Sequence, residues 1–381
     1  MISFCKHIRP WIIPAAAGLF LVIACYIYWN SQFTFGSGDE EIERAALIKN
    51  VLRHEAVLED PRVLPVNVSY DQMMVPYADD WGIPAGDIAI TDRGKLLRFC
   101  DSLAAWNNYR YILIDIDFGN GLSSPYDSAL FARIGGMRDI VVASSDPEST
   151  PEALASKAAP ATYTVLNSGD SFMKYRYLLP GGRESIALRM WKDLTGGTFK
   201  KHWWGYSSNG KLCNASVIPP MDYVVESDYS EDGEKLLYQL GTDIIDGIDG
   251  SAPLFNDRII LIGDWKENDM HDTIRHEQPG IAILYNAFLA LKSGKHHVPF
   301  WILLLLFVLF TIELRILFRP RKATVRVRSR SFRVIHFMEL LFGYSTPLAL
   351  MCIVLYLCCG MFVNTLIVGG VFSIIDVIIE Q

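Results

Sequence analysis

The stretch Tyr109–Phe118 (YRYILIDIDF) decides the fold, together with Arg258–Asp264 (RIILIGD) much later in the chain. Each contains four consecutive apolar residues, YILI and IILI. An uninterrupted apolar run of this length predicts a strand that is covered on both faces, as strands of parallel sheets are. Both runs end in acidic residues, so the same stretches that predict the core also predict polar groups at strand ends.

The segments around the first stretch alternate between strand and helix patterns. Such alternation predicts parallel strands joined by crossover helices, and therefore an α/β fold. We expect a mixed sheet with a parallel βαβ core flanked by helices. The predicted elements are strands at 63–70 and 139–143, and helices at 92–106, 126–134 and 280–293.

The region 145–250 has weaker patterns. Residues 162–166 and 174–179 favour strands of an antiparallel insertion, and 184–193 favours a helix. The aromatic segment His202–Gly205 (HWWG) is interpreted as a lid on an apolar patch. Residues 71–90 are rich in proline and glycine and are interpreted as turns.

Charge and hydropathy divide the 381 residues into an acidic middle and basic, apolar ends. The chain is 51% hydrophobic and 20% charged, with a net charge of −7, and this composition excludes a disordered chain or a disulfide-rich miniprotein. Residues 30–298 carry about −13, whereas the two ends together carry about +6. This division is typical of a membrane protein with one large water-exposed domain.

Four apolar segments predict transmembrane helices, at 11–29, 299–318, 335–358 and 362–379. A cleaved signal peptide is the alternative for the first, and one bent element is the alternative for the last two. By the positive-inside rule the tail 1–10 and the basic loop 319–334 are cytoplasmic, and 30–298 is extracytoplasmic. Seven basic residues of the loop are predicted to contact lipid: Arg319, Arg321, Lys322, Arg326, Arg328, Arg330 and Arg333.

Acidic residues and one histidine follow the two best strands. Because ligands of open parallel sheets bind outside the carboxyl ends of the strands, these side chains are candidates to converge on a ligand. The alternative is that aspartates after strands cap turns and helices. The candidate ligand-binding residues are Asp115, Asp117, Asp264, Asp269, His271 and Asp272.

Signals of catalysis are missing from the sequence. It contains no Walker lysine loop, no HExxH, no GxSxG and no CxxC, so we predict no enzyme activity, no catalytic residues, no cofactor and no metal site. A disulfide between Cys100 and Cys213 is left open, since both fall in the predicted exterior domain.

Several short motifs resemble the type-2 CHASE domain, an extracellular sensory domain of bacterial membrane receptors. The matching segments are VNVSYD ending at Asp71, ILIDIDF at 112–118, Asp127 with Ser-Ala-Leu, RIILIGD at 258–264, Asp269, Asp272-Thr273, Pro279-Gly280 and Asn286-Ala287. The Trp-Pro-Arg segment of the family is poorly matched by Ile90–Arg93, and no transmitter domain follows the last predicted span. The resemblance implies the sensing of an extracellular stimulus and identifies no ligand.

The sequence therefore predicts a multi-pass protein of the bacterial inner membrane that acts as a sensory or signal-input protein through a separate partner. Expected partners are membrane lipids, an extracytoplasmic ligand or protein, and a cytoplasmic or membrane signalling partner, with a homo-oligomer left open. Nucleic acid is not expected. The alternatives are a structural or assembly protein that binds an envelope partner and, less favoured, an extracytoplasmic hydrolase using His271.

Overall fold

The structure is a computed structural model that describes residues 2–30 and 60–317, apart from 80, 120, 146–147, 162, 166–170 and 274–275, together with 354 and 368. The basic loop and the two last predicted spans lie outside these residues, as do residues 31–59. The elements are α1 Ile2–Trp29, β1 Val63–Asn67, β2 Gln72–Ala78, β3 Pro84–Thr91, α3 Arg93–Trp106, β4 Tyr111–Asp115, α4 Asp127–Gly136, β5 Ile140–Ser144, β6 Ala158–Pro160, β7 Tyr163–Val165, β8 Ser171–Arg176, α5 Ile186–Thr195, β9 Phe199–His202, β10 Gly205–Ser208, β11 Lys211–Cys213, β12 Ser216–Val217, β13 Tyr238–Gln239, β14 Ile259–Gly263, β15 Met270–Thr273, β16 His276–Pro279, α6 Gly280–Lys292 and α7 Phe300–Leu317.

The central sheet has the strand order β13-β1-β14-β4-β5-β6, and every neighbouring pair is parallel. The apolar runs of β4 and β14 lie side by side in its middle and are fully buried. This placement confirms the parallel α/β core. The antiparallel strands form separate sheets, so the central sheet itself is not mixed.

Side-chain alternation along the strands divides the interior into two cores. Leu113 and Leu261 point to one face, which α5 and α6 cover, whereas Ile112 and Ile260 point to the other, which α3 and α4 cover. Burial on both faces explains why these strands are apolar at every position rather than at alternate ones.

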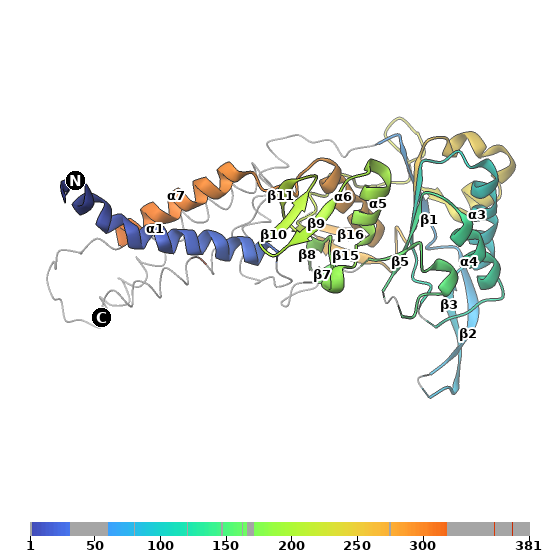
Figure 1. Cartoon of the computed structure of the whole chain (residues 1–381). Coiled ribbons are helices and arrows are strands. Elements are labelled where there is room, and N and C mark those ends of the chain that lie inside the picture. The colour runs from blue at the N-terminus through green and yellow to red at the C-terminus, as the bar shows by residue number, and fades with distance from the viewer. Residues whose placement is uncertain are drawn as a thin grey trace, which may run out of the picture.

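Two expectations for the loops are wrong. Residues 71–90 form the antiparallel hairpin β2–β3, which projects from the sheet (Figure 1), because Met73–Val75 and Ile88–Ile90 pair in register despite the flanking prolines and glycines. Trp203 and Trp204 form no lid, since their side chains are 97% and 47% exposed.

A second layer lies between the central sheet and the helices α1 and α7 (Figure 1). It contains a sheet of β12, β8, β15 and β16 with β7 at its side, and the meander β9–β10–β11. In this layer β8 and β15 are parallel, and the other pairs are antiparallel. The predicted antiparallel insertion is therefore present, and it contacts the ends of the long helices.

The helices α1 and α7 pack alongside each other at the end of the molecule opposite α3 and α4 (Figure 1). They approach closely at Gly18, where an added Cβ would lie 2.7 Å from Thr311 Oγ1. Within the described residues, one helix is long and apolar enough to cross a membrane by length and composition, at Trp11–Trp29. The length and composition of this helix support the membrane prediction for Trp11–Trp29. The four-span arrangement remains a prediction.

Candidate functional site

The carboxyl ends of three neighbouring strands meet in one row at the edge of the central sheet. Asn67 of β1 lies opposite Gly263 of β14, which lies opposite Asp115 of β4. The residues that follow these three line a cavity of about 300 Å³. Its walls are formed by Val68, Ser69, Gln72, Ala89, Ile90, Thr91, Arg93, Asp115, Ile116, Asp117, Leu122, Asp264 and Asn268. The predicted convergence of Asp115, Asp117 and Asp264 is therefore observed.

Asp264 organises the turn after β14. Its carboxylate accepts hydrogen bonds from the backbone N–H groups of Lys266, Glu267 and Asn268 at 2.9–3.0 Å. Ser69 Oγ also lies 2.5 Å from its Oδ1. Burial raises the pKa of Asp264, but these hydrogen bonds outweigh burial and the pKa lies below its usual value. Asp264 thus takes the turn-forming role that was the alternative to ligand contact.

Asp115 is the acidic group of the site with the strongest perturbation. Its Oδ2 is buried, and no described residue hydrogen-bonds to it. Burial raises the pKa of Asp115 well above its ordinary value, and the charges of Asp269 and Asp117 and a hydrogen bond with Asp269 act in the same direction. These effects favour the protonated form of Asp115, which can both donate and accept a hydrogen bond.

Asp269 links this acid to the next strand. Its Oδ1 lies 2.9 Å from His271 Nε2, at the start of β15. The sequence predicted that six residues, these three among them, converge on one ligand. The contacts instead join Asp115, Asp269 and His271 in a chain, and neither Asp269 nor His271 lines the cavity.

Arg93 is the charged residue of the cavity lining that the sequence analysis did not select. It begins α3 and is 2% exposed, and its Nε and Nη1 have no hydrogen-bond partner among the described residues. Its guanidinium lies 4.2 Å from the Phe118 ring centroid and 4.0 Å from Asp127 Oδ1. Helical spacing carries the signal that could have found it, since Arg93 lies three and seven residues before the buried Leu96 and Cys100.

The remaining candidates have local partners or lie away from the cavity. Asp117 Oδ1 accepts the backbone N–H of Gly119 at 2.8 Å, and its Oδ2 accepts from the hydroxyl of Ser145. Asp272 is exposed on β15 opposite Glu277, and it does not line the cavity.

The described residues contain no group of three or more histidines, cysteines and acids arranged to hold a metal ion. Cys100 and Cys213 are both free and buried, in the two separate cores on opposite faces of the sheet. Cys100 and Cys213 therefore form no disulfide with each other in this structure.

The last turn of α1 is fastened to the second layer by polar contacts. Ser216 Oγ donates to Trp29 O at 2.6 Å, and Lys174 Nζ donates to Tyr28 O at 3.1 Å. Asn30 completes the junction, because its Oδ1 accepts the backbone N–H of Ala215 at 2.6 Å. Carbonyls that the helix end leaves unpaired are thus satisfied by the folded domain.

Lys174 is a buried cation at the negative end of the α1 dipole. Its side chain is 8% exposed and lies 4.5 Å from the Tyr28 ring centroid. Burial lowers the pKa of Lys174 to about 8, so the ammonium group remains mostly charged at pH 7. A cation at this end of a helix is favourable.

The same segment of the second layer also holds the entry to α7. Val298 N donates to Leu212 O at 2.9 Å, and Asn214 N donates to His296 O at 2.9 Å. Residues 211–217 therefore contact the end of α1 and the residues that lead into α7. We call this segment, with Lys174 and residues 295–298, the junction.

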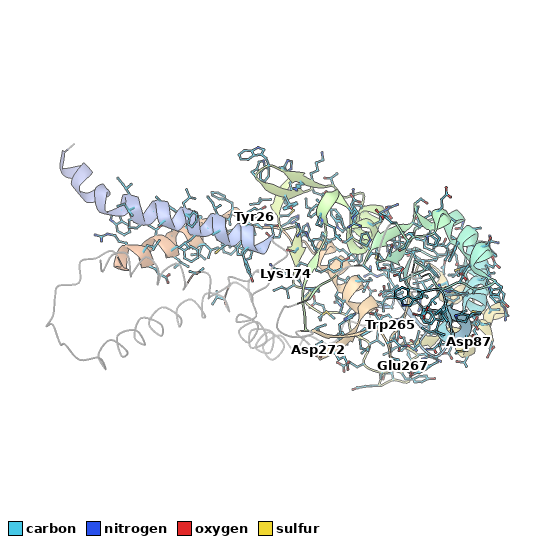
Figure 2. The ribbon with its side chains drawn as sticks, turned by 90° about the horizontal axis from the view of Figure 1, so that it is seen from below. Tyr26, Asp87, Lys174, Trp265, Glu267 and Asp272 are labelled. Carbon is cyan, nitrogen blue, oxygen red and sulfur yellow. The ribbon has the colours of Figure 1, made fainter. Side chains whose placement is uncertain are left out.

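A continuous structural route connects the cavity to the junction. The loop after β14 leads into β15, β15 pairs with β8 at Asp272–Ser171 and Thr273–Phe172, and β8 carries Lys174. Figure 2 shows Trp265 and Glu267 in the part of the domain far from α1, Asp272 nearer the middle, and Lys174 near the end of α1, where it bonds to Tyr28.

Comparisons with known proteins identify no relative. No protein-family model matches the chain, and no curated protein or solved structure matches it. The assignment of a role must therefore come from the geometry.

Proposed function

We propose that the chain is a membrane-anchored sensory protein whose α/β domain binds a small polar ligand in the Arg93–Asp115 cavity and transmits its state to α1 and α7. The observation that carries the proposal is the route from the Asp264 turn through β15 and β8 to Lys174, which caps the end of α1. The paired strands β15 and β8 form a stiff connection, so a shift of the Asp264 turn can reach α1 over a short distance. The short motifs that resemble the type-2 CHASE domain support the same role.

The cavity contains polar atoms of two kinds that lack hydrogen-bond partners among the described residues. Arg93 presents donors without acceptors, and Asp115 presents an unpaired oxygen on a carboxyl whose protonated form is favoured by burial. Unpaired buried polar groups cost about 1–3 kcal/mol each, so a ligand that pairs both gains that free energy on binding. A molecule with a carboxylate or carbonyl for Arg93 and a donor for Asp115 fits this chemistry and the volume of about 300 Å³.

The proposed placement is the bacterial inner membrane, with the α/β domain extracytoplasmic and α7 as a second span. The apolar α7 packs on α1 and enters from the same end of the domain, which supports this arrangement. Alkaline phosphatase fused near residue 200 should be active, and green fluorescent protein fused there should be dark. The opposite pair of results would overturn the topology.

The coupling can be tested without knowing the ligand, by ¹⁹F NMR of the full chain labelled with 5-fluorotryptophan in nanodiscs. Trp265 lies in the cavity loop and Trp29 at the junction, and each signal is assigned by a Trp→Phe variant. We expect Asp115→Asn to shift both resonances. In an Asp115→Asn/Lys174→Met double variant, Trp265 should still shift and Trp29 should no longer respond to Asp115→Asn.

The matched control is Asp101→Asn, which changes an exposed carboxylate paired with Arg133 on the far side of α3 and α4. It should leave Trp29 unchanged. If the Trp29 resonance does not shift in Asp115→Asn, transmission by this route is refuted. This conclusion does not depend on the identity of the ligand.

A second function, binding of an envelope protein, is favoured by the exposed apolar surface of the β2–β3 hairpin. Met74, Trp81 and Ile83 are 61%, 87% and 60% exposed. Under this alternative, Trp81→Ser should abolish co-purification of a stoichiometric extracytoplasmic partner. Unchanged co-purification would remove the hairpin as its binding surface.

A further inference from the structure

The hairpin β9–β10 carries two tryptophans at its turn, and the rest of the domain does not bury them. Trp203 is 97% exposed and Trp204 is 47% exposed, although tryptophan is one of the most costly side chains to leave in water. Trp204 stacks on His202 with ring centroids 4.7 Å apart, so the turn has a side-chain contact of its own. The turn is therefore an exposed, apolar tip with an internal ring contact.

The tip is attached at a defined height along α1. Tyr206 N donates to Tyr26 Oη at 3.2 Å, and Tyr26 Oη donates to Cys213 O at 3.1 Å. The approach is close, because a Cβ added at Gly205 would lie 2.3 Å from Tyr26 Oη. Tyr26 falls inside the apolar span Trp11–Trp29, about one turn from its end.

This contact fixes the position of the tip relative to a bilayer. If α1 crosses the membrane, Tyr26 lies at the boundary between hydrocarbon and headgroups, and Gly205 is pressed against it. Trp203 and Trp204 directly precede Gly205, so they lie at the same depth. Tryptophan is enriched at that depth because its ring is apolar while its N–H needs a polar partner.

The charge of the hairpin fits a phospholipid surface. Residues 199–213 (FKKHWWGYSSNGKLC) contain three lysines and no acid, in a domain that is acidic overall. Lys200, Lys201 and Lys211 are all exposed, and Lys200 and Lys201 occupy β9 beside the tip. Lysines near an anionic lipid surface are attracted to it electrostatically.

We propose that the β9–β10 turn, with Trp203 and Trp204 at its tip and the three lysines behind it, inserts into the headgroup layer of the bilayer that α1 enters. It is a third contact of the domain with the membrane, beside α1 and α7. Because β10 pairs with β11, and β11 belongs to the junction, the lipid contact holds the junction at a fixed height. The inference rests on the membrane insertion of α1 that the proposed function assumes.

The test is quenching of tryptophan fluorescence by brominated phospholipids, with the full chain in nanodiscs that contain phosphatidylglycerol. We compare the wild type with Trp203→Phe/Trp204→Phe, using lipids brominated near the headgroup or deep in the acyl chain. The double variant should lose a component that shallow bromines quench more strongly than deep ones. Both side chains are exposed, so the fold should tolerate the change, and an unchanged melting temperature checks this.

The matched control is Trp81→Phe, which removes an equally exposed tryptophan at the turn of the distal hairpin. The fluorescence lost in this control should be insensitive to either bromine position. If the component lost from Trp203→Phe/Trp204→Phe is as insensitive as that of Trp81, the inference is wrong.

Failure of the inference and failure of the membrane assignment give different results. Trp11 and Trp29 on α1 remain in the double variant and report on insertion of the helix. Quenching of those two without a Trp203–Trp204 component overturns the lipid contact alone. Absence of all quenching overturns the insertion of α1 as well.

Discussion

Replacing His296 by phenylalanine should remove a large part of the acid sensitivity of this protein. His296 is 1% exposed at the junction, with Tyr177, Trp191 and Phe199 around its ring. Burial lowers the pKa of His296 from 6.5 to about 3, and the neighbouring His297 acts in the same direction. The folded protein therefore keeps this ring neutral over a range in which the unfolded chain protonates it.

The sign and size follow from proton linkage. Between pH 6.5 and about 3 the unfolded state binds one proton more than the folded state, so stability falls as the pH falls through this window. Each pH unit costs about 1.4 kcal/mol once the unfolded histidine is charged. Between pH 7 and pH 5, His296 should thus lower the free energy of unfolding by about 2 kcal/mol.

The assay is urea unfolding of the full chain in nanodiscs at pH 7 and pH 5. The wild type should lose about 2 kcal/mol more than His296→Phe between the two values. Phe199→Leu is the control, because it disturbs the same aromatic cluster without a titrating group. It should lower stability by a similar amount at both pH values. Equal acid losses in wild type and His296→Phe would refute the linkage argument.

Three further predictions concern Asp115 in the cavity and two buried polar contacts elsewhere in the domain. Asp115→Asn should stabilise the protein more at pH 8 than at pH 4, because folded Asp115 keeps a proton that the unfolded chain releases above about pH 4, and unfolding midpoints at the two pH values will show the difference. Gly241→Ala should cost about 1–3 kcal/mol, since its Cβ would lie 2.3 Å from Asp71 Oδ1, which also pairs with Lys95, and a urea midpoint unchanged from wild type would contradict this. Asn286→Leu should lower the melting temperature markedly, because it removes the two buried hydrogen bonds that the Asn286 side chain makes with Tyr223 N and O, at about 0.5–1.5 kcal/mol for each bond. A calorimetric scan that shows no shift would exclude that role for Asn286.

Local patterns were sufficient for the elements of the core. The YILI and IILI runs predicted two strands buried on both faces, and apolar spacing predicted α3 and α6 within one residue of their observed ends. The hairpin β2–β3 was missed because its pairing depends on register between two strands whose turn residues alone suggest loops. The exposure of Trp203 was missed for a similar reason, since a sequence shows that a residue is apolar and not what covers it.

The sequence predicted the location of the site, but it did not predict the different chemical properties of its aspartates. Acidic residues after two parallel strands indicated the edge of the sheet at which Asp115, Asp117 and Asp264 meet. Their different roles depend on neighbours: Asp264 is surrounded by N–H donors, whereas Asp115 is desolvated beside Asp269. The N–H donors of Asp264 follow it directly in the chain, but Ser69 lies 195 residues from it, and no local pattern specifies that contact or the approach of Asp269 to Asp115.

The amino-acid sequence by itself determined the α/β class, the buried strands and the apolar helix at Trp11–Trp29, because each follows from the spacing of apolar side chains along a few turns or strands. Only the tertiary structure decided that β14 inserts between β1 and β4, that Arg93 and Asp115 share a cavity, and that Lys174 caps α1. Such contacts join residues far apart in the chain. Their free energy depends on burial and on which charges meet, and both are defined only once the chain has folded.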